Sequence, residues 1–236
     1  MKQIILTTAT CDNDYLDVLK AFLASIRLNS GYEGVIRADL INGNSEIYDR
    51  LKNIYSNLEI NHIELDRRDW HKQENMIHVM RKRMSSQYKA FTDGYGQILT
   101  LDCDAIVRKP IEHIWDGVGP GVLKVWLRKK KRPQYRFQAG VMVYGNSQKM
   151  RKYYKHFLDS LGSEWGFFDG QQALYEIYLK HKDEIKLISL PMDFNDCLFK
   201  KDSFIWHAKV NHMKEEPFVS TMHKYLKIAE EYYEGS

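Results

Sequence analysis

The chain has 236 residues, of which 44% are hydrophobic and 13% are aromatic. This is enough apolar surface for one packed domain, and no window approaches the length of a transmembrane helix. The first apolar stretch is too short for a signal peptide. The formal net charge of +4 is mild, so it favours anionic ligands and does not indicate nucleic acid. Three widely spaced cysteines argue against a disulfide scaffold and fit a reducing compartment.

The first half of the chain alternates apolar runs with helical patterns. The first run, Ile4–Ala9, is continuously apolar, as is typical of a buried parallel strand. Strands are predicted over Ile4–Ala9, Val35–Ile41, Leu58–Leu65 and Ile98–Leu101, and helices over Tyr15–Leu28, Ile47–Tyr55 and Met76–Thr92. This alternation predicts an α/β domain with a mainly parallel central sheet flanked by helices.

The second half adds elements of both kinds without an internal repeat or a linker. Strands are predicted over Val122–Leu127, Gln138–Tyr144, Ile185–Leu190 and Phe204–Trp206, and helices over Lys149–Leu161, Gln171–Lys180 and His223–Tyr233. A single domain is the simplest organisation for such a chain.

The most informative motif is Asp102-Cys103-Asp104, which follows the apolar run Ile98–Leu101. Two carboxylates one residue apart at the end of a buried strand repel each other and are penalised by burial. A divalent cation offsets both effects, and carboxylate oxygens suit magnesium or manganese, which keep water and substrate phosphates as further ligands. The motif therefore predicts a metal–diphosphate site and a phosphorylated substrate such as a nucleotide-sugar.

Two further polar clusters follow predicted strands. Thr7–Asp12 comes after the first strand, and His207-Ala208-Lys209 comes after Ile205-Trp206. Because ligands bind beyond the carboxyl ends of strands in an open parallel sheet, we expect both clusters to meet the two aspartates. The imidazole of His207 is a good manganese ligand, and lysines after it suit phosphate oxygens.

Four motifs in this order resemble the GT-A glycosyltransferases. They are Leu101–Asp104, Phe137–Tyr144, Asp169–Leu174 and Trp206–Lys209. The sequence is closest in style to glycogenin and the bacterial lipopolysaccharide galactosyltransferases, and it is also similar to small viral glycosyltransferases of that fold. The resemblance implies one GT-A domain over residues 1–236, with a nucleotide-binding half at 1–107 and an acceptor- and sugar-binding half at 108–236. The short first apolar stretch and the sparse cysteines predict a cytoplasmic protein, in the host cytoplasm if the source is a virus, or a catalytic piece of something larger.

The resemblance implies a role for each matching position. Asp102, Asp104 and His207 would bind Mn²⁺ or Mg²⁺, and Asp102 would also approach the ribose. The donor, a UDP-sugar by resemblance, would contact Thr8, Ala9, Thr10, Arg81, Lys89, Asp102, Gln138, Lys209 and Lys214. The acceptor would be a glycan or another hydroxyl compound, and Asp169, Gln171 and Gln172 would lie beneath the sugar or near that acceptor.

The stereochemistry of the predicted transfer decides which residue acts on the acceptor. If the anomeric centre is inverted, a carboxylate must take the proton of the acceptor hydroxyl, and Asp169 is the first candidate and Asp193 the second. If configuration is retained, no dedicated base is required and Gln171 would lie on the far face of the sugar. The chain departs from its relatives at Gly170, where they usually carry an aspartate, and at Val210–His212, which replaces a glycine-rich segment.

Other functions are open on the residues alone. A haloacid dehalogenase-type phosphatase also uses Asp-x-Asp, but near the start of its core domain and followed by a step such as Gly-Thr. A nucleotidylyltransferase would carry a glycine-rich phosphate loop after the first strand, and Thr8–Cys11 has no glycine. A non-catalytic nucleotide-sugar or glycan-binding module would not need Asp102, Asp104 and His207 together.

Each candidate residue also has a structural alternative. The aspartates can form a strand-end turn, His207 can be a core histidine, Gln138 can face solvent, and Asp169 can cap a helix. The basic run Arg128–Arg132 is either a solvated loop or a contact with the acceptor or an anionic surface. Trp165–Phe168 is a candidate stacking platform for an acceptor sugar.

Overall fold

The structure is a computed structural model that describes residues 1–11, 13–64, 73–129, 136–160 and 169–234. Its strands are β1 (Gln3–Thr10), β2 (Val35–Ile41), β3 (Leu58–Ile63), β4 (Gln97–Leu101), β5 (Ala105–Val107), β6 (Val122–Leu127), β7 (Phe137–Gly145), β8 (Lys186–Ser189) and β9 (Ile205–His207). Its helices are α1 (Asn13–Asn29), α2 (Ser45–Ile54), α3 (Gln73–Thr92), α4 (Gln148–Ser160), α5 (Asp169–His181), α6 (Lys209–His212) and α7 (Phe218–Tyr233), with 3-10 turns η2 (Glu112–Trp115) and η4 (Met192–Phe194). Within the described residues, no helix is both long and apolar enough to cross a membrane.

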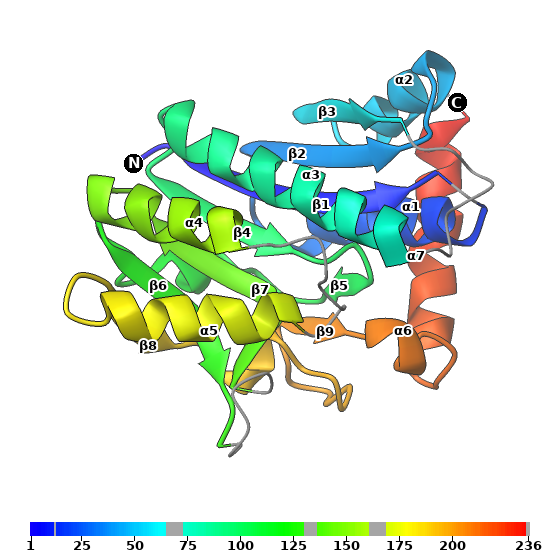
Figure 1. The fold of residues 1–236 in the computed structure, drawn as a ribbon. Coiled ribbons are helices and arrows are strands. Elements are labelled where there is room, and N and C mark those ends of the chain that lie inside the picture. The colour runs from blue at the N-terminus through cyan, green and yellow to red at the C-terminus, as the bar shows by residue number, and fades with distance from the viewer. Residues whose placement is uncertain (12, 65–72, 130–135, 161–168, 235–236) are drawn as a thin grey trace. The chain divides into compact units, whose positions relative to one another are not determined.

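Seven strands form one mainly parallel sheet in the order β3-β2-β1-β4-β7-β6-β8, and β5 pairs with β9 in a second, two-stranded sheet (Figure 1). The predicted α/β class with a mainly parallel central sheet is therefore confirmed. The chain divides into two compact units, which alternate along the sequence. The first unit is Met1–Ile4, Ile63–Thr100 and Gly117–Leu190, and the second is Ile5–His62, Leu101–Asp116 and Pro191–Ser236. The prediction of one domain stays a prediction.

The first unit is built on β6, which pairs antiparallel with β7 and parallel with β8. Helix α4 packs between α3 and α5, and α5 contacts β7 (Figure 1). Aromatic side chains fill the interior, and Tyr144, Tyr153 and Tyr154 are fully buried. Because a buried hydroxyl needs a partner, Tyr153 donates to the carbonyl of Leu174 at 3.0 Å, which ties α4 to α5.

The second unit packs its C-terminal helix α7 against α1 and α2, and α1 also contacts β5. Two side chains of α1 hold β5 in place. The hydroxyl of Ser25 accepts from the Val107 backbone N–H at 3.1 Å, and Asn29 Nδ2 donates to the Val107 carbonyl at 2.8 Å. A three-residue strand has little stability of its own, so these bonds and the pairing with β9 fix the chain that follows Asp104.

A histidine pair joins α4 to α5 in the first unit. His156 Nδ1 lies 2.8 Å from His181 Nε2, and the His181 side chain is buried. Burial is the largest cause that lowers the pKa of His181 below its usual 6.5, followed by the charge of His156. Lys152 also lowers that pKa, and Glu184 raises it. The folded chain therefore favours neutral His181.

This pair predicts a loss of stability in acid. Below about pH 6.5, His181 becomes protonated in the unfolded chain but stays neutral in the folded chain. The free energy of unfolding therefore decreases as the pH is lowered, until the pH passes the lowered pKa of folded His181. We expect urea denaturation between about pH 7 and pH 5 to show that the free energy of unfolding drops more with decreasing pH in the wild type than in His181→Gln. His113→Gln is the matched control, because that side chain is 74% exposed. An equal slope in wild type and His181→Gln would contradict the assignment.

Candidate metal centre

The Asp102–Asp104 motif forms the turn that links β4 to β5. The backbone N–H of Ala105 donates to the Asp102 carbonyl at 3.2 Å, which closes the turn. Strand β9 then pairs antiparallel with β5, with Ala105 opposite His207. The Asp104 carbonyl accepts from the Ala208 backbone N–H at 3.0 Å. This register brings the imidazole to the turn that carries both carboxylates.

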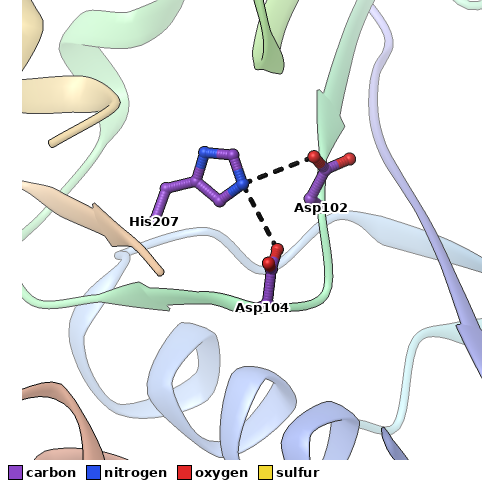
Figure 2. Close-up of side chains that lie close together, drawn as sticks. All are labelled: Asp102, Asp104 and His207. Atoms are coloured by element: carbon purple, nitrogen blue, oxygen red, sulfur yellow. Dashed lines mark ion pairs between the residues drawn. The ribbon is translucent and has the colours of Figure 1, made fainter. Parts of the chain in front are cut away.

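The three side chains point toward one another (Figure 2). His207 Nε2 lies 3.4 Å from Asp102 Oδ2 and 3.3 Å from Asp104 Oδ1. One ligand atom from each residue lies within 4.8 Å of the others, and among the described residues no other group of three such side chains does so. The predicted meeting of Asp102, Asp104 and His207 is confirmed, whereas a plain strand-end turn does not account for the imidazole between the carboxylates.

The site concentrates negative charge in a place that water reaches poorly. The side chain of His207 is 4% exposed, that of Asp104 is 12% and that of Asp102 is 27%. Burial is the largest single cause and lowers the pKa of His207, whereas the charge of Asp104 raises it. Hydrogen bonds to the two carboxylates and to Cys197 act in the same direction, so the pKa lies well above its usual value. A positive charge is therefore favoured between these carboxylates.

The other ring nitrogen of His207 faces Asn195, and the two atoms Nδ1 and Oδ1 are 2.9 Å apart. Asn195 directly follows η4 and has no solvent exposure. The next residue, Asp196, extends the pairing of β9. Its backbone N–H donates to the Ile205 carbonyl at 3.1 Å, and its carbonyl accepts from the His207 N–H at 2.9 Å. The segment that carries the amide is thus attached to the strand that carries the imidazole.

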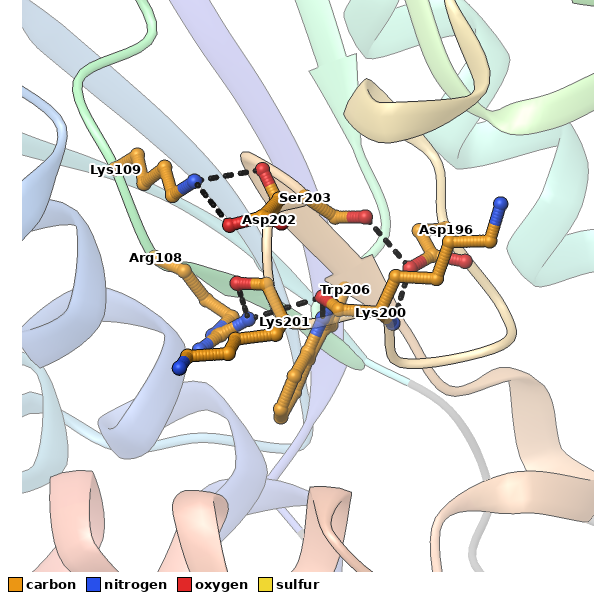
Figure 3. A network of polar contacts seen from close by, with 8 residues as sticks. All are labelled: Arg108, Lys109, Asp196, Lys200, Lys201, Asp202, Ser203 and Trp206. Carbon is orange, nitrogen blue, oxygen red and sulfur yellow. Dashed lines mark hydrogen bonds and ion pairs between the residues drawn. The ribbon is translucent and has the colours of Figure 1, made fainter.

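The carboxylate of Asp196 organises the loop that returns to β9 (Figure 3). Oδ1 accepts from the Leu198 N–H at 2.8 Å, and Oδ2 accepts from the Lys200 N–H at 2.6 Å and from the Ser203 hydroxyl at 2.7 Å. Asp196 is fully buried. Because a buried charge is tolerated only when it is well hydrogen-bonded, these three bonds account for its place.

Arg108 and Trp206 form hydrogen bonds with the backbone of the same loop (Figure 3). Arg108 Nη1 donates to the carbonyls of Lys200 and Lys201 at 3.1 Å and 2.9 Å, and its guanidinium lies 3.7 Å from the centre of a Trp206 ring. Trp206 Nε1 donates to the Lys200 carbonyl at 2.8 Å. The carbonyls of Lys200 and Lys201 are thus bonded by Arg108, which follows β5, and by Trp206, which lies in β9.

Six other predicted site residues belong to the second unit. Thr8, Ala9 and Thr10 end β1, and the Thr10 hydroxyl is buried without a hydrogen-bond partner among the described residues. Lys209 begins α6 with a left-handed φ of 51°, and Lys214 is exposed. Asp193 lies in η4 with an exposed side chain, and its carbonyl accepts from the Phe204 N–H at 2.8 Å. Their contacts with a donor or acceptor stay predictions.

The remaining predicted residues belong to the first unit. Arg81 and Lys89 are exposed on α3, and Gln171 is half-buried on α5. Gln138 on β7 is 3% exposed, so the alternative that it faces solvent is wrong. Helix α5 begins at Asp169, but that side chain, residues 130–135 of the basic loop and the aromatic segment 165–168 lie outside the described residues.

Sequence reasoning did not identify Asn195, Asp196 or Arg108 as part of this centre. The only local signal is that Asn195-Asp196 lies between apolar residues, which is typical of a turn. The sequence has no pattern that connects this pair with His207, because the connection is made through strand pairing.

Comparison with known proteins supports the fold. No family model matches the sequence, and no curated protein matches it. Among solved structures, the apo form of mouse xyloside xylosyltransferase 1 is similar, with a TM-score of 0.58 and 15% sequence identity. The match covers 90% of this chain and 99% of that one. This likeness shows a GT-A-like fold, and it does not single out the glycogenin or lipopolysaccharide galactosyltransferase group.

Proposed function

We propose that this protein is a metal-dependent glycosyltransferase that moves a sugar from a nucleoside-diphosphate donor, a UDP-sugar, to a hydroxyl group of a glycan or another acceptor. The observation that carries the proposal is the meeting of Asp102, Asp104 and His207 within 4.8 Å. It occurs in a fold shared with a xylosyltransferase. Neither the donor nor the acceptor follows from the fold, so both are part of the proposal.

The chemistry of the three side chains fits a divalent cation. Two carboxylate oxygens and an imidazole nitrogen are hard or intermediate ligands that suit Mn²⁺ or Mg²⁺. The raised pKa of His207 indicates that the metal-free site already favours positive charge between the carboxylates, after burial has opposed it. A cation would take the place of that proton, because a ligating imidazole must be deprotonated.

When bound, the cation would supply Lewis-acid stabilisation of the charge that develops on the leaving nucleoside diphosphate. Asp102, Asp104 and His207 Nε2 would hold it. We assign the nucleoside pocket to Thr8–Thr10. The buried hydroxyl of Thr10 has no hydrogen-bond partner in the part of the chain that the structure describes, which supports a polar ligand there. Lys209 and Lys214, which follow His207 in the chain, are assigned to the diphosphate, whose oxygens suit lysine ammonium groups.

The acceptor hydroxyl needs a proton acceptor only if configuration is inverted. We keep Asp169 and Asp193 as the two candidates. The side chain of Asp193 is exposed, and η4 has no side-chain cap among the described residues, so Asp193 does not cap this turn. Gln171 is assigned to the far face of the sugar if configuration is retained. Arg81, Lys89 and Gln138 are assigned to the donor by the sequence resemblance.

A thermal-shift screen of nucleotide-sugars with Mn²⁺ tests the proposal. A donor at about 100 times its dissociation constant adds about 2.7 kcal/mol, which raises the melting temperature of a chain this size by about 5–10 °C. We expect one UDP-sugar to give this shift with Mn²⁺ and to lose it with a chelator. A panel without any metal-dependent shift would contradict the proposal.

The product of the reaction separates the alternative functions. A glycosyltransferase is expected to release free sugar and UDP slowly from its donor in the presence of Mn²⁺ and to transfer the sugar when an acceptor is added. A binding module would give the thermal shift without turnover. A phosphatase would release inorganic phosphate from phosphomonoesters and leave the nucleotide-sugar intact.

A further inference from the structure

Both ring nitrogens of His207 have a polar neighbour, and the neighbour of Nδ1, on the side away from the carboxylates, is Asn195. Nε2 faces Asp102 and Asp104, whereas Nδ1 lies 2.9 Å from Asn195 Oδ1. Both His207 and Asn195 are buried, so water does not readily replace this contact. The hydrogen bond therefore bears directly on which ring nitrogen can bind a cation.

We infer that Asn195 is a positioning residue that fixes the His207 ring in the tautomer required for metal binding. An amide oxygen only accepts hydrogen bonds, so the single N–H of a neutral imidazole lies on Nδ1 when that nitrogen faces Oδ1. The lone pair of Nε2 is then directed toward the carboxylates. The inference rests on the proposed function, because it assumes that the cation binds at this site.

The main chain holds the amide in this orientation. The Asn195 N–H donates to the Met192 carbonyl at 2.8 Å, which closes η4. The pairing of Asp196 with Ile205 and His207 then keeps the amide next to the ring. Movement of Asn195 would therefore disturb two backbone connections as well as the side-chain bond.

The neutral character of Asn195 fits the charge of the site. Many metal-binding histidines donate to a carboxylate, which raises the basicity of the ring. Here Asp102 and Asp104 already supply two negative charges, and Asp196, the residue after Asn195, adds a fully buried carboxylate. An amide accepts the same hydrogen bond without another charge to desolvate.

Two substitutions separate the hydrogen bond from the packing. Asn195→Leu keeps the approximate volume and removes the acceptor, and we expect the affinity for Mn²⁺ alone to fall by about 10- to 100-fold. Asn195→Asp keeps an acceptor and cannot donate while it is ionised, and we expect it to bind Mn²⁺ within a few-fold of wild type or more tightly. Asn29→Ala is the control, because its side chain also bonds β5 through the Val107 carbonyl but does not contact His207.

Mn²⁺ affinity is measured by calorimetry, and pulsed electron paramagnetic resonance reports the ligand directly. With ¹⁵N-labelled histidine, the wild type and Asn195→Asp are expected to show coupling between Mn²⁺ and one nitrogen, which His207→Gln abolishes. Asn195→Leu is expected to weaken or lose this coupling while Asn29→Ala keeps it. Circular dichroism melting shows which variants fold.

The outcomes distinguish this inference from the proposed function. Absence of Mn²⁺ binding to the wild type would overturn both. If the wild type binds Mn²⁺ with nitrogen coupling, and Asn195→Leu changes neither the affinity nor the coupling, the positioning role alone would be overturned. A tenfold loss in folded Asn195→Asp would also overturn it, because the amide would then act as a donor to Nδ1.

Discussion

Asp104→Asn is expected to weaken the Mn²⁺-dependent binding of UDP by at least about 100-fold, because loss of a direct ligand should exceed the 10- to 100-fold cost of changing an outer partner. The substitution keeps the size of the side chain and removes its charge. Asp104 Oδ1 lies 3.3 Å from His207 Nε2, so the replaced atom belongs to the centre of the cluster. A neutral amide is a poorer ligand for a hard cation than a carboxylate.

Calorimetric titration of UDP with Mn²⁺ and with a chelator measures this effect. Asp116→Asn is the matched control, since this aspartate lies in the same unit and its side chain is 73% exposed. Both variants are expected to fold as judged by circular dichroism. If Asp104→Asn bound UDP as tightly as the control in the presence of Mn²⁺, the assignment of the metal centre would be wrong.

The longer elements of this fold could be predicted from local patterns. The bounds of β2 and β6 coincide with those predicted, and α3 and α4 begin within a few residues of theirs. These segments carry apolar runs or helical periodicity over several residues, and such signals do not depend on distant partners. Helix α7 begins at Phe218, earlier than the predicted His223, because its first turn lacks a clear capping side chain.

Short strands were less predictable. The sequence pattern predicts no strand over Ala105–Val107, and the strand that it predicts over Phe204–Trp206 begins one residue before β9 and has no predicted partner. Each has three residues, and each gains its hydrogen bonds from the other across about a hundred positions of sequence. Local composition carries no information about such a partner.

The same distinction applies to the candidate site. Asp102, Asp104 and His207 could be named because their chemistry is unusual at the ends of apolar strands. Asn195 and Asp196 could not be named, because a turn with these residue types is common. Their place beside His207 depends on the pairing of Asp196 with β9. The ligands were therefore readable from residue type, whereas the residues that hold the imidazole became visible only through three-dimensional contacts.

The loop formed by residues 196–203 gives the largest stability effect that we predict. Asp196→Asn is expected to lower the free energy of unfolding by about 3–5 kcal/mol, because hydrogen bonds to a charged acceptor are each worth about 1.5–3 kcal/mol and are only partly replaced. Oδ2 accepts from both the Lys200 N–H and the Ser203 hydroxyl. An amide nitrogen at that position would place a donor against two donors.

Urea denaturation of Asp196→Asn measures the change, with Asp202→Asn as the control. Asp202 belongs to the same loop, but its side chain is 98% exposed and lies 3.7 Å from Lys109, so we expect a change below about 0.5 kcal/mol. Limited digestion with trypsin adds a local reading, because opening of this loop exposes the bonds after Lys200 and Lys201. Faster cleavage there in Asp196→Asn, but not in Asp202→Asn, is expected. Equal stability of the two variants would mean that the buried carboxylate of Asp196 does not hold the loop. In that case only the backbone pairing of Asp196 with β9 would support the contact between Asn195 and His207.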